Sequence, residues 1–187
     1  MAAIEPVKIY RHCATQNNAP WGLARLSARK KLSPSGPYQY TNGSSGEGTV
    51  AYVIDTGIND AHVDFEGRAS KGPLFTTPEP GKTISVEDTY GHGTHCAGTI
   101  AGKTYGVAKK ATVVGVKVFN DDPEPGATNE DIIKALEWVV GETKAHGKTS
   151  VVNLSLGGGP SDALDQAIAA TVRSGVVVCV AAGNEGV

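Results

Sequence analysis

The segment YGHGTHCAGTIAG, residues 90–102, carries the densest set of side chains able to do chemistry. It places His92, His95 and Cys96 among four glycines. Residues of these types serve three kinds of site: a zinc centre, a glycine-rich loop that binds phosphate, or the proton-transfer group of an enzyme with a nucleophile. An isolated histidine at the start of a helix is usually a surface or capping residue, so the residues that could join it decide between these sites.

A zinc centre is the first alternative. His92, His95 and Cys96 are possible ligands, and Asp55 could complete the set. The chain has no second cysteine pair and no HExxH sequence, however. A dinucleotide loop is the second alternative, because the glycines are spaced like a stretched G-x-G-x-x-G. No strand leads directly into them, since the preceding KTISVEDTY is polar and interrupted. We therefore expect neither a metal ion nor a dinucleotide at this segment.

Two residues elsewhere favour proton transfer. A histidine that takes up and returns a proton needs a carboxylate on its far nitrogen, and Asp55 can provide it from the end of the apolar segment TVAYVID. The reaction also needs a donor to a developing oxyanion, and the amide of Asn184 in AAGN can serve. The order aspartate, histidine, amide is itself informative, because catalytic triads occur in distinct chain orders. We expect His92 to be the acid–base group.

These residues need rigid elements to position them, and the apolar pattern predicts such elements from residue 49 onward. Short β-branched apolar runs predict strands within 49–55, 111–119, 150–159 and 176–184. Helical periodicity and capping residues predict helices within 91–102, 128–147 and 161–175. Before residue 49 we expect a loop at 32–48 and a short helix at 19–27, anchored by Trp21, Leu23 and Leu26.

Strands that alternate with helices form parallel sheets with right-handed crossovers. Because the predicted strands are almost wholly apolar, helices should cover both sheet faces. The predicted fold class is therefore α/β, with a parallel, doubly wound sheet and helices on both faces. Ligands bind such sheets beyond the carboxyl ends of the strands. Asp55, Ser155 and Asn184 each lie at the end of a predicted strand, so we expect them at one edge of the sheet.

Composition limits the remaining functions. The chain has 187 residues, 40% of them hydrophobic, and a formal charge of -2. Without a long basic block we expect neither nucleic-acid nor membrane binding. The odd count of three cysteines excludes a disulfide scaffold, and Cys179 in VVVCVAA should be a buried thiol. No stretch reaches transmembrane length, and the N-terminus lacks the apolar centre of a signal peptide.

Six motifs follow one another in the chain: VIDTGI (53–58), GHGTHCAGTIAG (91–102), GVAKKA (106–111), VKVF (116–119), NLSLGGG (153–159) and VAAGN (180–184). In this order they resemble the subtilisin-like serine proteases. HGTHCAG, with its cysteine, is similar to the proteinase K branch. The segments 19–27, 62–69 and 105–111 are most similar to the cerevisin-type vacuolar proteases of fungi. The resemblance runs from about residue 19 to the end and covers the N-terminal part of the family's fold, with the C-terminal part missing.

The resemblance implies a role for each matching residue. Asp55 would orient the imidazole, His92 would be the general base and then the general acid, and Asn184 would donate to the oxyanion. His95 would be a helix residue behind the catalyst, and Cys96 would pack beneath it as a plain thiol. No metal would take part in the reaction and no cofactor would be required.

The resemblance also implies substrate contacts. Ser155, Leu156 and Gly157 would form an exposed edge that pairs with the substrate backbone. The opposite edge of the substrate site would include Gly126 and Ala127. Ala182 and Gly183 would line the pocket for the residue before the scissile bond. The family often binds calcium, but a structural calcium has no assignable ligands here. The acidic pair Asp121 and Asp122 is expected to be a solvated turn.

The family's nucleophile lies in a GTSMA-type motif, and no GTS sequence occurs in this chain. Ser155 is a poor substitute, since NLSLGGG is a strand edge without a sharp turn to expose the hydroxyl. Loss of the nucleophile costs on the order of a millionfold in rate. We therefore expect a serine endopeptidase with an Asp-His-Ser triad, present as a fragment that is inactive alone. The alternative is a non-catalytic pseudoprotease or a remnant that binds peptides or a partner.

The expected domains are a propeptide remnant or added tail at 1–18 and an incomplete peptidase domain at 19–187. NGS at 42–44 is a glycosylation acceptor, which suits passage through the secretory pathway to the vacuole or the outside of the cell. Expected partners are polypeptide substrates and either an inhibitory propeptide or a complementing C-terminal fragment.

Overall fold

The computed structural model describes residues 13–32, 36–41, 45–76, 83–121, 126–184 and 186. The chain divides into two compact units, Met1–Ser45 and Gly46–Val187. The NGS acceptor lies outside the described residues. The boundary expected near residue 18 stays a prediction, although a strand continues through that position. Within the described residues, no helix is both long enough and apolar enough to span a membrane.

The first unit contains strand β1 (Cys13–Ala19), helix α1 (Trp21–Ser27) and strand β2 (Gly36–Thr41). β1 and β2 pair antiparallel. The short helix is confirmed, but two of its three expected anchors are wrong: Trp21 and Leu26 are exposed, and Leu23 packs in the core beside Ala24. The expectation of a loop throughout 32–48 is also wrong, because β2 lies within it.

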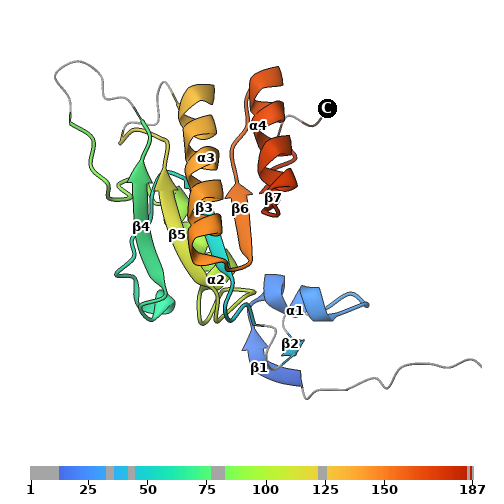
Figure 1. Cartoon of the computed structure of the whole chain (residues 1–187). Coiled ribbons are helices and arrows are strands. Elements are labelled where there is room, and N and C mark those ends of the chain that lie inside the picture. The colour runs from blue at the N-terminus through green and yellow to red at the C-terminus, as the bar shows by residue number, and fades with distance from the viewer. Residues whose placement is uncertain are drawn as a thin grey trace, which may run out of the picture. The chain divides into compact units, whose positions relative to one another are not determined.

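The second unit is built on a parallel sheet with the strand order β4-β5-β3-β6-β7 (Figure 1). Its strands are β3 (Val50–Asp55), β4 (Ala69–Leu74), β5 (Thr112–Lys117), β6 (Ser150–Leu154) and β7 (Val177–Val180). Its helices are the 3-10 turn η1 (Val63–Phe65), α2 (His92–Ala101), α3 (Asn129–His146) and α4 (Asp162–Arg173). Apart from β4 and η1, these elements match the predicted ones.

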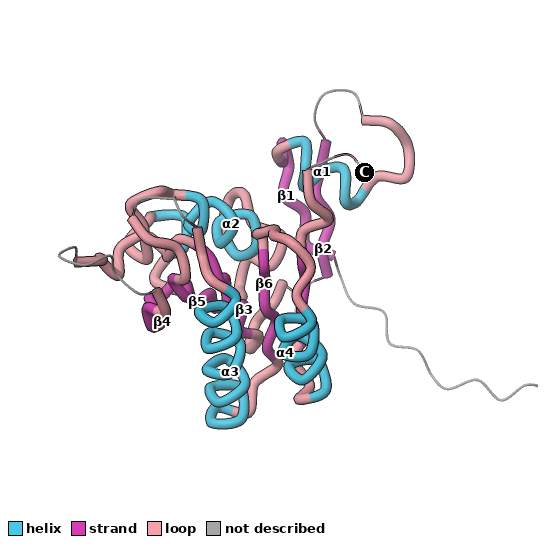
Figure 2. Tube along the Cα trace, turned by 90° about the horizontal axis from the view of Figure 1, so that it is seen from above, coloured by secondary structure: helices cyan, strands magenta, loops and turns pink. Residues whose placement is uncertain are grey.

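Helices lie on both faces of this sheet, with α3 and α4 on one side and α2 on the other (Figure 2). The α/β doubly wound class is therefore confirmed. Alternating residues of β3 point to the two sides: Tyr52 and Ile54 pack in the core with α3, whereas Ala51 and Val53 pack in the core with α2. β3 is the central strand and is buried at every position, so its carboxyl end is a rigid support for Asp55.

Local signals explain where the long helix α3 begins and ends. The Thr128 hydroxyl accepts a hydrogen bond from the Asp131 backbone N–H at 3.1 Å, which satisfies a donor at the helix start. Gly147 ends the helix with φ 64°, in the left-handed region that favours glycine. One prediction about burial is wrong: Cys179 is exposed, because β7 is an edge strand in the described part of the sheet.

Candidate active site

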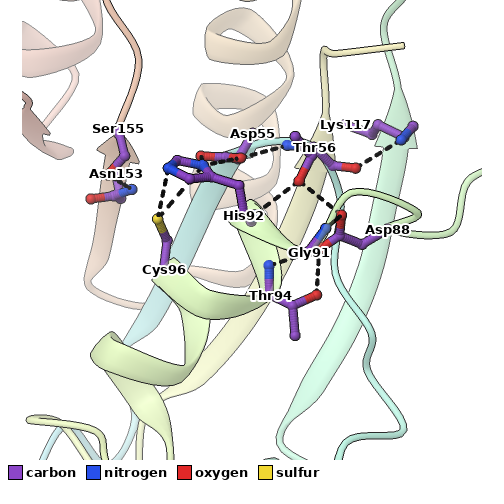
Figure 3. Close-up of polar contacts among 11 residues, drawn as sticks. Asp55, Thr56, Asp88, Gly91, His92, Thr94, Cys96, Lys117, Asn153 and Ser155 are labelled. Carbon is purple, nitrogen blue, oxygen red and sulfur yellow. Dashed lines mark hydrogen bonds and ion pairs between the residues drawn. The ribbon is translucent and has the colours of Figure 1, made fainter. Parts of the chain in front are cut away.

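The predicted carboxylate and histidine meet beyond the carboxyl end of β3 (Figure 3). Nδ1 of His92 lies 2.7 Å from Oδ1 and 2.9 Å from Oδ2 of Asp55. Asp55 is fully buried, while 47% of the His92 side chain remains exposed. Because Nδ1 faces the carboxylate, Nε2 is the ring nitrogen that could exchange a proton with a substrate or nucleophile.

The neighbouring strand β5 and the following residue fix Asp55. Its backbone carbonyl accepts from Val118 N–H at 2.9 Å, which continues the ladder between β3 and β5. Its Oδ1 also accepts from the backbone N–H of Thr56 at 2.7 Å. A buried carboxylate is costly without such donors. Asp55 is therefore held from the main chain as well as by the histidine ring.

Glycines bring His92 close to Asp55. Gly91 precedes α2 with φ 95°, a left-handed conformation that lets the chain turn sharply into the helix. At Gly93 a Cβ atom would lie 2.2 Å from the carbonyl oxygen of Gly57 and 3.2 Å from Cβ of Asp55. The first turn of α2 thus packs directly on the turn after β3, and any side chain at position 93 would push the helix away.

Cys96 lies one turn after His92 on α2, and its Sγ is 4.0 Å from each ring nitrogen. Burial raises the pKa of the Cys96 thiol, the nearby carboxylates of Asp55 and Asp88 raise it further, and a hydrogen bond with Ser155 opposes them. The thiol is therefore mostly protonated near neutral pH. This contact agrees with the expected place beneath the histidine, although Cys96 is half-buried rather than enclosed.

The zinc alternative can be compared with this geometry. Ligand atoms of Asp55, His92 and Cys96 lie within 4.8 Å of one another, whereas His95 is exposed and is not part of the group. His92 already directs Nδ1 at both Asp55 oxygens. A metal bound between them would have to replace that hydrogen bond. The arrangement fits an oriented imidazole better, and the absence of a metal role stays a prediction.

The expected substrate-binding residues follow the ends of neighbouring strands. After β6, Ser155 and Leu156 are half-buried and Gly157 is exposed. The Ser155 hydroxyl accepts from the Asn153 side-chain amide at 2.9 Å. Leu156 packs against the core that α3 covers, which shows that it is a support as much as a surface residue.

The remaining predicted residues lie at the same edge of the sheet. Ala182, Gly183 and Asn184 are exposed and follow β7 directly, and Gly183 has φ 89°. Gly126 and Ala127 precede α3 in the connection that begins at the carboxyl end of β5, and both are half-buried. The parallel topology therefore brings all the predicted positions to one edge, while their individual roles stay predictions.

Sequence reasoning missed a group of polar residues around this pair. Thr56, Asp88 and Lys117 form hydrogen bonds that link the turn after β3 to the start of α2. Asp121 is exposed, as expected of a solvated turn, but it also accepts from Ser85 N–H and the Thr89 hydroxyl and pairs with Lys117 at 3.1 Å. Asp122, the other member of that acidic pair, lies outside the described residues. The available signals were the acidic residues Glu87 and Asp88 shortly before His92, and the acidic residues 121 and 122 shortly after β5.

A separate cavity of about 300 Å³ does not belong to this site. Tyr52, Trp138 and His146 contribute to its lining, on the face that α3 covers. Asp55 and His92 lie on the opposite face, with α2. The Asp55–His92 pair and this cavity therefore lie on different faces of the sheet. We place the candidate site at the pair, because its side chains can transfer a proton.

Comparisons with known proteins identify the family of the second unit. A model of the subtilase family, Peptidase_S8, matches residues 46–187, which is the whole second unit. The chain belongs to the subtilase family. The boundary of the match coincides with the boundary between the two units, so the sheet with Asp55 and His92 is the family's domain.

Individual relatives extend this result. The chain is 48% identical to the subtilase-type proteinase psp3 of Schizosaccharomyces pombe, over 99% of this chain and 40% of that protein. It is 49% identical to the subtilisin-like serine protease Pen c 2 of Penicillium citrinum, over 92% of this chain and 39% of that protein. The chain thus spans about 40% of the length of these relatives.

Solved structures show the same fold. A cold-adapted subtilisin-like serine proteinase superposes with a TM-score of 0.74 at 40% identity, covering 90% of this chain and 57% of that one. The S41 psychrophilic protease gives a TM-score of 0.73 at 30% identity, covering 93% and 55%. These matches agree with the sequence resemblance and with the predicted fold class.

Proposed function

We propose that His92 is the acid–base group of a serine endopeptidase and that Asp55 orients its ring. The observation that carries this proposal is the buried Asp55 carboxylate 2.7 Å from Nδ1 of a half-exposed His92 ring. A carboxylate in this place fixes the tautomer and stabilises the imidazolium that forms during catalysis. The subtilase membership of the chain supports the same reaction.

The reaction would proceed through both ring nitrogens. Nε2 of His92 takes the proton from a serine hydroxyl while that oxygen attacks the carbonyl carbon of the peptide bond. The imidazolium keeps its Nδ1–H bond to Asp55 and then gives the Nε2 proton to the leaving amine. The amide of Asn184 donates to the oxyanion of the tetrahedral intermediate. Water then hydrolyses the acyl-enzyme with the same histidine as base.

The substrate would be an extended polypeptide. Ser155, Leu156 and Gly157 would pair with its backbone along one side, and Gly126 and Ala127 along the other. Ala182 and Gly183 would line the pocket for the residue before the scissile bond. Main-chain pairing of this kind tolerates many sequences, so the proposed enzyme has broad specificity. An inhibitory propeptide, a complementing C-terminal segment and a bound structural calcium are further proposed partners of the same enzyme.

The nucleophile would come from outside these residues. No GTS sequence occurs among the 187 residues, and the Ser155 hydroxyl already accepts a hydrogen bond from Asn153. The proposal is therefore that residues 1–187 alone are inactive and that a longer polypeptide supplies the serine. Passage through the secretory pathway to the vacuole or cell exterior is proposed on the resemblance to cerevisin-type proteases. The formed Asp55–His92 pair favours this enzyme over a non-catalytic remnant.

Labelling with a fluorophosphonate that reacts with activated serines tests the proposal. The longer polypeptide that contains this chain should be labelled, its His92→Ala variant should lose the label, and residues 1–187 alone should remain unlabelled. Peptidase activity of residues 1–187 that His92→Ala abolishes would contradict the missing nucleophile. A longer polypeptide that folds but never reacts would contradict the enzyme itself.

A further inference from the structure

Thr56, the residue after Asp55, uses all of its polar groups and is only 6% exposed. Its backbone N–H donates to Asp55 Oδ1 at 2.7 Å, and its carbonyl accepts from Lys117 Nζ at 2.8 Å. Its hydroxyl donates to Asp88 Oδ1 at 2.8 Å and accepts from the Gly93 backbone N–H at 2.9 Å. A hydroxyl carries one hydrogen, so the two contacts fix its orientation. Thr56 therefore joins β3, α2 and the loop before α2 (Figure 3).

Asp88 connects Thr56 to the start of α2. Its carboxylate accepts from the backbone N–H groups of Gly91 at 2.8 Å and Thr94 at 2.9 Å, and from the Thr94 hydroxyl. The first N–H groups of a helix have no partner within the helix, so Asp88 satisfies donors that α2 leaves open. Burial acts to raise the pKa of Asp88, but hydrogen bonds from Thr94, Gly91 and Thr56 outweigh it and lower the pKa below its ordinary value. Asp88 is thus an anion at the positive end of the helix dipole.

Lys117 anchors Thr56 from the other side. It lies opposite Asp55 in the pairing of β3 with β5, and it is only 2% exposed. Besides the Thr56 carbonyl, Lys117 Nζ contacts Asp121 Oδ1 at 3.1 Å. Asp121 in turn accepts from Ser85 N–H at 3.1 Å, so the loop that leads into α2 is tied to the same cation. A buried ammonium group with these partners leaves Thr56 little freedom to move.

We propose that the Thr56 hydroxyl is a positioning group that sets the Asp55–His92 hydrogen bond. Asp55 is fixed by β3, whereas the half-exposed His92 ring depends on where α2 begins. The Thr56 hydroxyl bonds both to the first turn of α2, through Gly93, and to the Asp88 carboxylate that caps it. Thr56 does not touch the reacting atoms, so it acts through the placement of the two residues that do.

The consequence for catalysis rests on the proposed function, but the consequence for the hydrogen bond does not. Displacing a catalytic group by about 1 Å can cost on the order of a hundredfold in rate. Removing the hydroxyl should therefore lower kcat and leave KM nearly unchanged, because the expected substrate edges lie after β6 and before α3. In the same variant, the imidazole N–H that His92 shares with Asp55 should lose its strongly deshielded proton resonance.

Thr56→Val tests this inference, because valine keeps the branched shape and removes the hydroxyl. Thr56→Ser, which keeps the hydroxyl, is the matched rescue variant. Thr99→Val is the control on the same helix, since the Thr99 hydroxyl bonds only to the His95 carbonyl among the contacts described for it. The readouts are the His92 N–H resonance, assigned with His92→Ala, and kcat and KM of the longer, serine-containing polypeptide.

We expect Thr56→Val to lose the resonance and ten- to a hundredfold in kcat, about the cost of a slight misplacement. Thr56→Ser should keep the resonance and most of kcat, and Thr99→Val should match the parent. If Thr56→Val does not fold, Thr56→Cys replaces it, with a weak S–H donor of similar size and an intermediate expected loss. An unchanged resonance and kcat in the folded Val or Cys variant would overturn the inference, as would equal losses in Ser and Val. If the longer parent polypeptide has no peptidase activity, the proposed function is contradicted. The His92 N–H resonance then still decides whether Thr56 positions the Asp55–His92 hydrogen bond.

Discussion

Asp55 and His92 differ sharply in their access to water, since the carboxylate is fully buried and 47% of the histidine side chain is exposed. The buried carboxylate accepts a hydrogen bond from the Thr56 N–H and is bonded to the His92 ring, so its oxygens are not left without partners. The exposed member can meet a substrate. In this arrangement the buried Asp55 carboxylate orients the imidazole, and the accessible imidazole can transfer a proton, which suits the proposed acid–base role of His92.

The two free cysteines assigned in the structure should differ in reactivity. Cys96 is half-buried beside His92, and burial and nearby carboxylates raise its thiol pKa, so less thiolate forms at a given pH. Cys179 is exposed on β7. We expect iodoacetamide at mildly alkaline pH to alkylate Cys179 well before Cys96, as measured by peptide mapping over time. The difference should vanish in denaturant. Faster labelling of Cys96 in the folded chain would contradict the burial that surrounds it.

At the scale of elements, the sequence predicted the parts of the fold that carry their own signal. β3, β5, β6 and β7 are apolar runs, and α3 has a capping threonine and a final glycine. β4, with the sequence ASKGPL, was missed because it is polar and contains glycine and proline. It is a strand because β5 provides a pairing edge, as in the hydrogen bond from Val113 N–H to the Arg68 carbonyl. Such strands depend on a partner that local sequence does not reveal.

The anchoring of α2 and of the turn after it should make the fold sensitive to acid. Burial acts to raise the pKa of Asp64, but hydrogen bonds from Thr104 and Tyr105 outweigh it, and the pKa lies below 3.8, as it does for Asp88. A carboxyl group whose pKa is lower in the folded than in the unfolded state stabilises the fold at pH values above its unfolded pKa. That stability is lost as the pH falls through the folded pKa. We expect the free energy of unfolding to fall steadily below pH 3.8.

Urea unfolding at several pH values measures this dependence. Asp88→Asn should be less stable than the parent near neutral pH, by about 1–3 kcal/mol for the lost charged acceptor. It should also lose less stability on acidification, because one of the responsible carboxylates is gone. Asp162→Asn, which removes an exposed carboxylate in the first turn of α4, is the control and should follow the parent. A parallel acid response in Asp88→Asn and the parent would show that Asp88 does not contribute.

At the scale of the whole molecule, topology explains which part of the site could be predicted. Asp55 ends a strand and His92 starts a helix that returns to it, so chain order and parallel strands were sufficient to bring them together. The hydrogen bonds of Thr56, Asp88 and Lys117 could not be predicted in this way. Their partners lie in different elements, and only the close packing of α2 on the turn after β3 makes them neighbours.

The edge of the sheet is a second property of the whole molecule. β7 is the terminal strand of the described sheet, and Val177 and Val180 on it are 55% and 61% exposed. An apolar strand with open backbone groups pairs readily with another chain. Residues 1–187 in isolation should therefore self-associate as their concentration rises, which light scattering and size-exclusion chromatography can follow.

Val177→Lys combined with Val180→Lys should reduce the association, because charged side chains on an edge strand oppose pairing. Since both side chains are exposed, each change should alter the free energy of unfolding by no more than about 0.5 kcal/mol. Val63→Lys, at a valine that is 86% exposed in η1, adds a charge elsewhere and should leave the association unchanged. Equal effects of the edge and η1 variants would assign the association to overall charge and not to β7.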